Sequence, residues 1–212
     1  MFNVLKSTVT IPKKPAKAVG ALFLLALLSA CGVSSVNIQG NFPTPNVQKM
    51  PLTLAVLYDD ALREFNYIEY TETGQEEFDI RSGESVIQLF NAVLPAMFDR
   101  VVFVDSMDEA RSSGADALFQ PAIEEFQLAL PYKTKLDVFE VWIKYNLRLL
   151  SPEGDYIADW VLTSYGKTPQ SGFRSNEAAI NEAAVVALRD LGSSFTLSFS
   201  QVPEVRDWLA SR

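Results

Sequence analysis

Two residue types that support most enzyme chemistry are missing or nearly missing from this chain of 212 amino acids. Histidine is absent, and Cys31 is the only cysteine. Without an imidazole, the chain cannot assemble a Ser-His or Cys-His nucleophile or a histidine-type metal site. A lone cysteine also excludes an intramolecular disulfide. Catalysis would therefore have to rest mainly on carboxylates.

Adjacent carboxylates occur at three places, Asp59-Asp60, Glu76-Glu77 and Glu124-Glu125. Two carboxylates can hydrolyse a glycosidic bond when they face one cleft about 5–10 Å apart. Neighbouring residues on a strand point to opposite faces, so each pair is badly placed to act alone. The sequence also lacks a calcium loop of the DxDxDG type. We interpret the pairs as solvated surface and expect a protein that is not an enzyme, with no catalytic residue, no metal and no cofactor.

The charges divide the chain into a basic start and an acidic remainder. The whole chain has 18 Lys and Arg against 26 Asp and Glu, a net charge of −8. Residues 1–30 contain four lysines and no acidic residue, so subtracting those four charges leaves −12 over residues 31–212. Phosphate groups repel so acidic a body, which argues against nucleic acid or a bare anionic bilayer as its partner.

Residues 1–30 have the order of a secretory signal peptide. A basic stretch is followed by the uncharged run ALFLLALLSA at residues 21–30. Such peptides combine a basic region, an apolar core of about 7–15 residues and small residues at the cleavage site. A membrane-spanning helix needs about 20 apolar residues, so this run is too short to be a permanent anchor.

The residues Leu28-Ser29-Ala30-Cys31 resemble the bacterial lipobox, in which an aliphatic and two small residues precede an invariant cysteine. The resemblance implies diacylglyceryl transfer to the Cys31 sulfur, cleavage before Cys31 and acylation of the new amino terminus. Several acyl chains give the stable anchoring that one chain does not. By resemblance to lipoprotein sorting rules, Gly32 favours the periplasmic face of the outer membrane. The alternative is a cysteine that happens to end an ordinary signal peptide.

Residues 31–51 are expected to form a lipidated N-terminus and a flexible tether. They contain Ser, Gly, Asn and three prolines and show no sustained hydrophobic period. This composition is typical of a linker, which would let the folded body stand away from the membrane. We expect residues 52–212 to form a single periplasmic domain.

Apolar runs and alternation predict a sheet in this domain. The strongest signal is at residues 139–149, where apolar and polar residues alternate and only Trp142 breaks the polar set. A period of two indicates an antiparallel strand with one buried and one solvated face. Pro121 indicates a sheet edge or a bulge. The predicted strands cover residues 52–58, 65–80 (with a turn around Gly74), 101–104 (buried), 117–130, 139–149 and 156–165, the last followed by a loop over 166–175.

Apolar residues at three- and four-residue spacing predict two main helices. The first begins at Gly83 or Glu84 after Ser82, and Pro95 should kink or shorten it. The second follows Ser175 or Asn176 as cap. Shorter helices are expected after Ser106 and over residues 204–210. The predicted fold is α+β, with the two main helices packed on a mainly antiparallel sheet.

Three stretches stand out in the predicted domain: ADALFQPAIEEF (115–126), VWIKYNLRLLSPEGDYIADWVLTSYG (141–166) and the Ala-rich helix that follows. Together they resemble a module of Gram-negative outer-membrane lipoproteins, including the curli-secretion-channel lipoproteins and related small envelope lipoproteins. The resemblance spans about residues 52–200 and implies a small α+β periplasmic module. Channel-forming members carry long extra hairpins that cross the membrane, and no segment of this chain supplies them.

Aromatic residues of the predicted hairpin are candidate partner contacts. Trp142 stands on a polar strand face beside Lys144, and an exposed aromatic among charges is a reasonable contact anchor. We take Trp142, Lys144 and Trp160 as the candidate partner-binding residues. The alternative is ordinary packing, with Trp142 covered by the N-terminal segment or by the last helix around Trp208, and with Trp160 in the core.

Three functions fit this sequence. The first is a non-enzymatic accessory or assembly factor of an envelope complex, anchored by lipid and bound to an envelope protein. The second is a carrier of lipid or a small ligand, which requires an apolar cavity of several hundred cubic ångströms. The third is a subunit of a ring-shaped secretion or transport assembly, which would make the protein a homo-oligomer.

Overall fold

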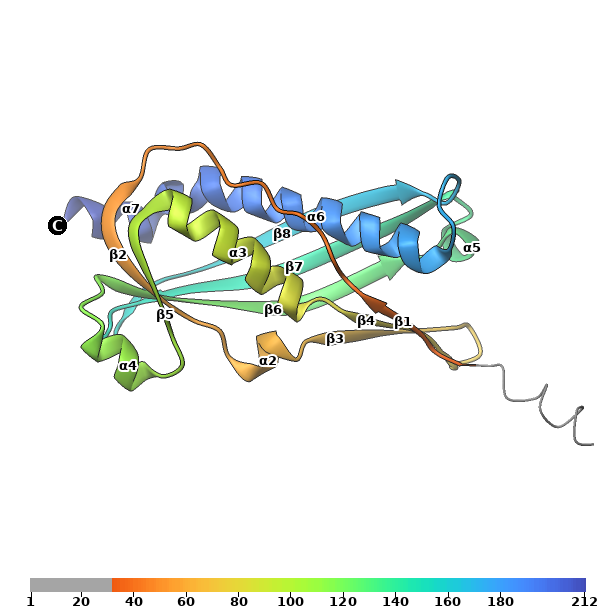
Figure 1. Cartoon of the computed structure of the whole chain (residues 1–212), viewed down its shortest axis with the longest axis horizontal. Coiled ribbons are helices and arrows are strands. Elements are labelled where there is room, and N and C mark those ends of the chain that lie inside the picture. The colour runs from red at the N-terminus through yellow and green to blue at the C-terminus, as the bar shows by residue number, and fades with distance from the viewer. Residues whose placement is uncertain (1–31) are drawn as a thin grey trace, which may run out of the picture. The chain divides into compact units, whose positions relative to one another are not determined.

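The computed structural model describes residues 32–212 (Figure 1). The predicted signal peptide and the lipidation site Cys31 lie outside the described residues. One compact unit, Ser34–Arg212, contains two sheets and the helices that pack on them. The α+β prediction is confirmed.

A five-stranded sheet, in the order β5-β2-β6-β7-β8, forms the larger layer. The part formed by β6, β7 and β8 is antiparallel, as predicted, since β7 pairs antiparallel with both β6 and β8. The strand β2, which comes first in the chain among these five, instead pairs parallel with β5 and β6, because helical crossovers separate these strands in the chain. The strands are β2 (Met50–Leu57), β5 (Phe98–Val104), β6 (Ala117–Ala129), β7 (Val138–Leu150) and β8 (Tyr156–Pro169).

A three-stranded sheet forms the smaller layer, in the order β1-β4-β3. Its strands are β1 (Ser34–Asn37), β3 (Asn66–Tyr70) and β4 (Glu76–Arg81). The predicted turn around Gly74 joins β3 to β4, and Gly74 has the positive φ of +80° that such a turn requires. β1 runs parallel to β4, with Ser34 opposite Phe78.

The two main helices are α3 (Gly83–Met97) and α6 (Asn176–Ser198). Ser175 caps α6, because its hydroxyl accepts a hydrogen bond from the backbone nitrogen of Ala178 at 3.3 Å. Pro95 lies in the last turn of α3, which ends two residues later. The short elements are α2 (Asp60–Arg63), α4 (Met107–Ser112), α5 (Pro131–Thr134), the 3-10 turn η2 (Phe199–Gln201) and α7 (Pro203–Ala210).

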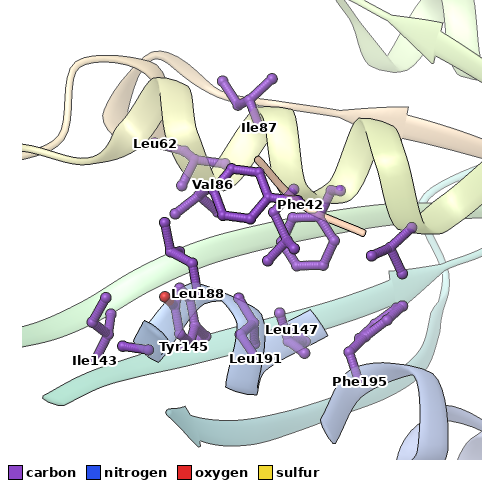
Figure 2. Close-up of a cluster of buried hydrophobic side chains, with 14 of the residues drawn as sticks. Phe42, Leu62, Val86, Ile87, Ile143, Tyr145, Leu147, Leu188, Leu191 and Phe195 are labelled. Carbon is purple, nitrogen blue, oxygen red and sulfur yellow. The ribbon is translucent and has the colours of Figure 1, made fainter. Parts of the chain in front are cut away.

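The main core lies between one face of the large sheet and the helices α3 and α6. Figure 2 shows Leu188 and Leu191 of α6 beside the inward residues Tyr145 and Leu147 of β7, with α3 on the far side of this cluster. Apolar residues at three- and four-residue spacing along α6 and at its C-cap are buried, namely Ile180, Ala184, Ala187, Leu188, Leu191, Phe195 and Phe199. Full burial of a large apolar side chain stabilises a fold by about 1.5–3 kcal/mol.

The segment expected to be a flexible tether is packed onto the domain from Ser34 onward. Val36 and Ile38 alternate inward from β1, and Phe42 is buried between the two main helices (Figure 2). The backbone nitrogen of Gln39 donates to Asn181 of α6 at 2.7 Å. The tether prediction is therefore wrong for this stretch, because three apolar side chains bind it to the core.

Two smaller expectations also need correction. Residues 101–104 do not form a buried strand, since β5 is an edge strand on which Phe103 is 49% exposed. The loop predicted to start at residue 166 starts later, because β8 continues to Pro169. The edge position expected for Pro121 is confirmed locally, because β2 pairs with β6 only as far as Phe119. The bulge does not fall at Pro121, which pairs with Leu147, but between Ile123 and Glu125.

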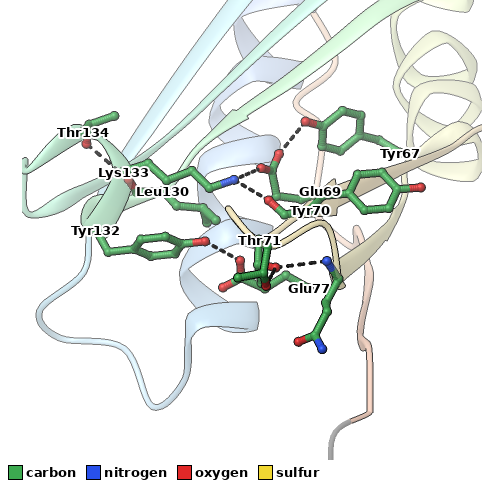
Figure 3. Close-up of polar contacts among 11 residues, drawn as sticks. Tyr67, Glu69, Tyr70, Thr71, Glu77, Leu130, Tyr132, Lys133 and Thr134 are labelled. Carbon is green, nitrogen blue, oxygen red and sulfur yellow. Dashed lines mark hydrogen bonds and ion pairs between the residues drawn. The ribbon is translucent and has the colours of Figure 1, made fainter.

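An ion pair fastens the small sheet to α5 (Figure 3). The Lys133 ammonium pairs with the Glu69 carboxylate and also donates to the backbone oxygen of Tyr70. Glu69 is only 7% exposed, and its second oxygen accepts a hydrogen bond from the Tyr67 hydroxyl at 2.5 Å. Nearby, the Tyr132 hydroxyl donates to Glu77 at 2.5 Å.

Candidate partner-binding face

The face of the large sheet that points away from α3 and α6 is open over β6, β7 and β8. At the other end of the sheet, α4 covers this face with a small apolar cluster that includes Ala110 and Leu118. We call the open part the outer face. It comprises Gln120, Glu125, Gln127, Glu140, Trp142, Lys144, Asn146, Arg148, Asp159, Val161, Thr163, Tyr165 and Lys167, none of which is buried.

Trp142 and Tyr165 form an aromatic pair on this face. They stand opposite each other on β7 and β8, with ring centroids 4.5 Å apart and planes tilted by 43°. The Tyr165 hydroxyl donates a hydrogen bond to the Glu140 carboxylate, and this bond, together with partial burial, raises the pKa of Tyr165 to about 12. Trp142 remains 49% exposed, so neither the N-terminal segment nor α7 covers it.

Opposite charges surround the aromatic pair. The Lys144 ammonium lies 2.6 Å from the Glu124 carboxylate, which holds the pKa of Lys144 above its usual range and that of Glu124 below it. Arg148 and Asp159 face each other across β7 and β8 at 3.5 Å. A hollow of about 180 Å³ opens beside the Trp142 ring, with Lys144 and Thr163 in its wall. The face thus offers an aromatic anchor within a polar rim, the composition of a protein interface.

Trp160 does not belong to this face. It stands opposite Leu147 in the register and packs against Phe195 and Phe199, with ring centroids 6.5 Å and 5.9 Å away. Its indole nitrogen is buried and has no hydrogen-bond partner among the described residues. Of the three predicted contact residues, the structure brings only Trp142 and Lys144 together.

A bulge in the hairpin explains this separation. Leu150 pairs with Tyr156, whereas Leu149 pairs with Ala158, so Ile157 is an extra residue on β8. Counting back from the turn without the bulge would put Trp160 opposite Asn146, on the outer face. One extra residue reverses the faces of a strand. Tyr165, which is not among the three predicted contact residues, lies beside Trp142 for the same reason.

The strand geometry also separates residues whose sequence spacing would suit catalysis. Ser164-Tyr165-Gly166-Lys167 has the SxxK spacing of some serine nucleophiles, yet Ser164 is buried against α6 while Lys167 is exposed on the outer face. Asp59 accepts the first backbone hydrogen bonds of α2, with its carboxylate 2.8 Å from the Leu62 nitrogen. Over residues 32–212, no three or more acidic, cysteine or histidine side chains gather in a metal-binding arrangement.

Two other hollows bear on the carrier hypothesis. A hollow of about 770 Å³ lies between α2 and the start of α3, and its wall includes Arg63, Glu64, Arg81 and Glu84. An apolar groove of about 270 Å³ runs between α3 and α6 and includes Leu197. The larger hollow is charged and the apolar one is small, so neither resembles the apolar cavity that a lipid carrier requires. Within residues 32–212, none of the helices combines the length and the apolar composition needed to cross a membrane.

Sequence comparisons find no relatives. No protein-family model matches the chain, and no curated protein has a matching sequence.

Several solved structures are similar to this chain at low sequence identity. A Xanthomonas campestris protein of the DUF330 family model is 14% identical, over 83% of this chain and 98% of that one, with a TM-score of 0.49. A minor lipoprotein from Acinetobacter baumannii is 13% identical, over 73% and 94%, with a TM-score of 0.39. The PelC dodecamer of Paraburkholderia phytofirmans is 17% identical, over 72% and 92%, with a TM-score of 0.40. Similarity at this level supports no argument about function.

Proposed function

We propose that this protein is a non-enzymatic lipoprotein, anchored to the periplasmic face of the outer membrane, that binds an envelope protein through the outer face of its large sheet. It would serve as an accessory or assembly factor of an envelope complex. The observation that carries the proposal is the half-exposed Trp142, paired with Tyr165 on a mostly polar sheet face.

The anchor rests on the lipobox resemblance of residues 28–31 and on the signal-peptide pattern before it. Cys31→Ser removes the sulfur that would carry diacylglycerol. We expect this variant to accumulate as an uncleaved precursor without acyl label. Normal acyl labelling of the variant in the outer-membrane fraction would disprove lipidation at this residue.

The binding face rests on the physics of interface anchors. A large aromatic side chain gains free energy when a partner takes it out of water, and truncation of such anchors costs binding about 1–2 kcal/mol or more. The Glu140 carboxylate and the Trp142 ring fix Tyr165, so the aromatic pair is already ordered before a partner arrives. Less side-chain entropy is then lost on binding.

The test compares two aromatic truncations of equal exposure. Trp142 and Phe103 are each 49% exposed and each lie beside a tyrosine ring, but Phe103 is on the edge strand β5, three strands away from β7. After crosslinking in the native envelope, Trp142→Ala should lose a protein that wild type and Phe103→Ala retain. Equal recovery by all three chains would remove the outer face as the binding site.

A ring-shaped assembly remains the second candidate for the quaternary structure. The mass of the detergent-solubilised lipoprotein distinguishes the two proposals, since an accessory factor can be a monomer and a ring subunit cannot.

A further inference from the structure

Three loops meet at the end of the domain where β1 begins. They are the β3–β4 turn (71–75), α5 with the residues after it (131–137) and the β8–α6 loop (170–175), which lie together on the right in Figure 1. The Tyr132 hydroxyl joins α5 to β4 through Glu77, and the Gln170 nitrogen joins the third loop to Asp137 at 2.9 Å. We call this the loop end of the domain.

The chain enters the domain at this end. Ser34, the first residue of β1, pairs with Phe78 near the start of β4, just after the β3–β4 turn. Only Gly32 and Val33 separate Cys31 from Ser34. Since an extended residue spans about 3.3–3.6 Å, the backbone from Cys31 to Ser34 reaches at most about 11 Å. A free tether over residues 31–51 would have reached about 70 Å.

Large apolar and aromatic side chains are exposed at the loop end. Tyr70, Tyr132, Leu136 and Phe173 are 48%, 52%, 54% and 39% exposed. Tyr70 ends β3 just before the β3–β4 turn, and the other three come from the α5 segment and the β8–α6 loop. Tyrosine, phenylalanine and leucine are the side chains that settle at the boundary between headgroups and acyl chains. Lys135, which is exposed beside Leu136, can keep its ammonium at headgroup level while its methylenes lie on apolar surface.

We propose that the loop end rests on the lipid bilayer that holds the anchor, with Tyr70, Tyr132, Leu136 and Phe173 at headgroup level. This inference depends on lipidation of Cys31, which belongs to the proposed function. The short reach from Cys31 brings the loop end to the membrane. The contact is favourable because the exposed apolar side chains of the loop end leave water when they enter the bilayer surface. Glu72, Glu76 and Asp137 lie at the same end and would be repelled by anionic lipid. The contact is therefore made by the apolar side chains and does not require anionic lipid.

Membrane contact at the loop end also sets how far each residue of the outer face of the sheet lies from the membrane surface. β7 starts at the loop end with Val138 and finishes at Leu150. At about 3.3 Å per strand residue, Trp142 lies about 13 Å from the start of the strand, and Leu150 about 40 Å. The partner of the proposed function would therefore be bound close to the membrane surface.

Two single-cysteine variants of the full lipoprotein test the contact. Acylation consumes the only native thiol, so a new cysteine can be labelled alone. Leu136→Cys places an environment-sensitive fluorophore at the loop end. Tyr156→Cys is the control, because Tyr156 is 65% exposed at the opposite end of the strands. Both labelled proteins are inserted into phosphatidylcholine vesicles with and without lipids that carry a shallow nitroxide.

We expect the nitroxide lipids to quench the probe at position 136 at least twofold more than the probe at position 156, and iodide to show the reverse order. Equal quenching of both probes in protein shown by mass spectrometry to be acylated would overturn membrane contact by the loop end. Protein that lacks the acyl chains would instead refute the lipidation on which the inference rests, so the two failures are distinguishable.

Discussion

Gly166 of β8 lies directly against the backbone of α6 at Ala183. A Cβ atom at Gly166 would fall well inside contact distance of the Ala183 carbonyl oxygen and of the Ala187 backbone nitrogen. The helix therefore approaches the sheet at a distance that only glycine allows. This contact lets the small alanines of α6 pack on β8 and sets how deeply the helix sits over the core.

Replacing Gly166 should consequently loosen the whole helix. Gly166→Ala places a Cβ atom against the backbone of α6, and no rotamer change can relieve that clash. We therefore expect a loss of about 2–4 kcal/mol in the free energy of unfolding, at or above the usual cost of overpacking. Gly40→Ala is the matched control, since its Cβ meets only the Val185 side chain, at 2.7 Å. Urea unfolding of residues 32–212 measures both. Equal losses would mean that α6 shifts away from β8 as easily as the Val185 side chain changes rotamer.

The ion pair between Lys133 and Glu69, which joins α5 to the small sheet, provides a second prediction. Lys133→Met removes the cation from Glu69 and leaves a carboxylate that is 7% exposed without its ion pair. Breaking a buried pair from one side costs about 3–5 kcal/mol, and because Lys133 is partly exposed we expect about 1–3 kcal/mol here. Glu69→Gln in the same chain should restore most of the loss. A double-mutant cycle in urea gives the coupling, and purely additive effects would contradict the pair.

Much of this architecture follows from patterns that act within one element. The alternation at residues 139–149 and the helical spacing after Ser175 predicted β7 and α6, because burial of one face is a local property of the sequence. The fold class followed from their order. Parallel pairing of β2 with β5 and β6 has no such local pattern, since it depends on how the crossovers bring distant strands together.

The candidate site was predictable only in part, for the same kind of reason. Trp142 shows itself by breaking an alternation within its own strand. The partner of Trp142 depends on the register of a second strand, and the extra residue Ile157 shifts that register by one. A bulge of this kind leaves no reliable mark in the sequence, so the aromatic residues of the hairpin do not show by themselves that Tyr165, and not Trp160, lies beside Trp142.

The hydrogen bond between Tyr165 and Glu140 predicts a dependence on alkaline pH. The pKa of Tyr165 is raised from 10.0 to about 12, so the folded chain holds this proton more tightly than the unfolded chain. Its stabilising contribution is present below about pH 10 and is lost as the pH rises toward 12. Glu140→Gln removes the charged acceptor and should lower the pKa of Tyr165. Carbon NMR of the labelled ring measures it.

The control for this titration is Glu153→Gln, a charge change in the exposed turn between β7 and β8. It should leave the pKa of Tyr165 where it is in the wild type. A Glu140→Gln protein with an unchanged Tyr165 titration would show that burial alone sets the pKa of this phenol.

The two tryptophans of the hairpin should respond in opposite ways to the same truncation. Trp160 packs on Phe195 and Phe199, so Trp160→Ala leaves a cavity and should cost about 3–5 kcal/mol of unfolding free energy. Trp142→Ala removes only a cross-strand pair on an exposed face, a change of about 1 kcal/mol or less. Urea unfolding measures both variants, and partner recovery per folded molecule completes the comparison.

Trp160→Ala should lower partner recovery only as far as it lowers the folded fraction, whereas Trp142→Ala should lower partner recovery in fully folded protein. A large stability loss for Trp142→Ala would place its ring in the core, and a small one for Trp160→Ala would mean that the bulge at Ile157 does not set the register in solution.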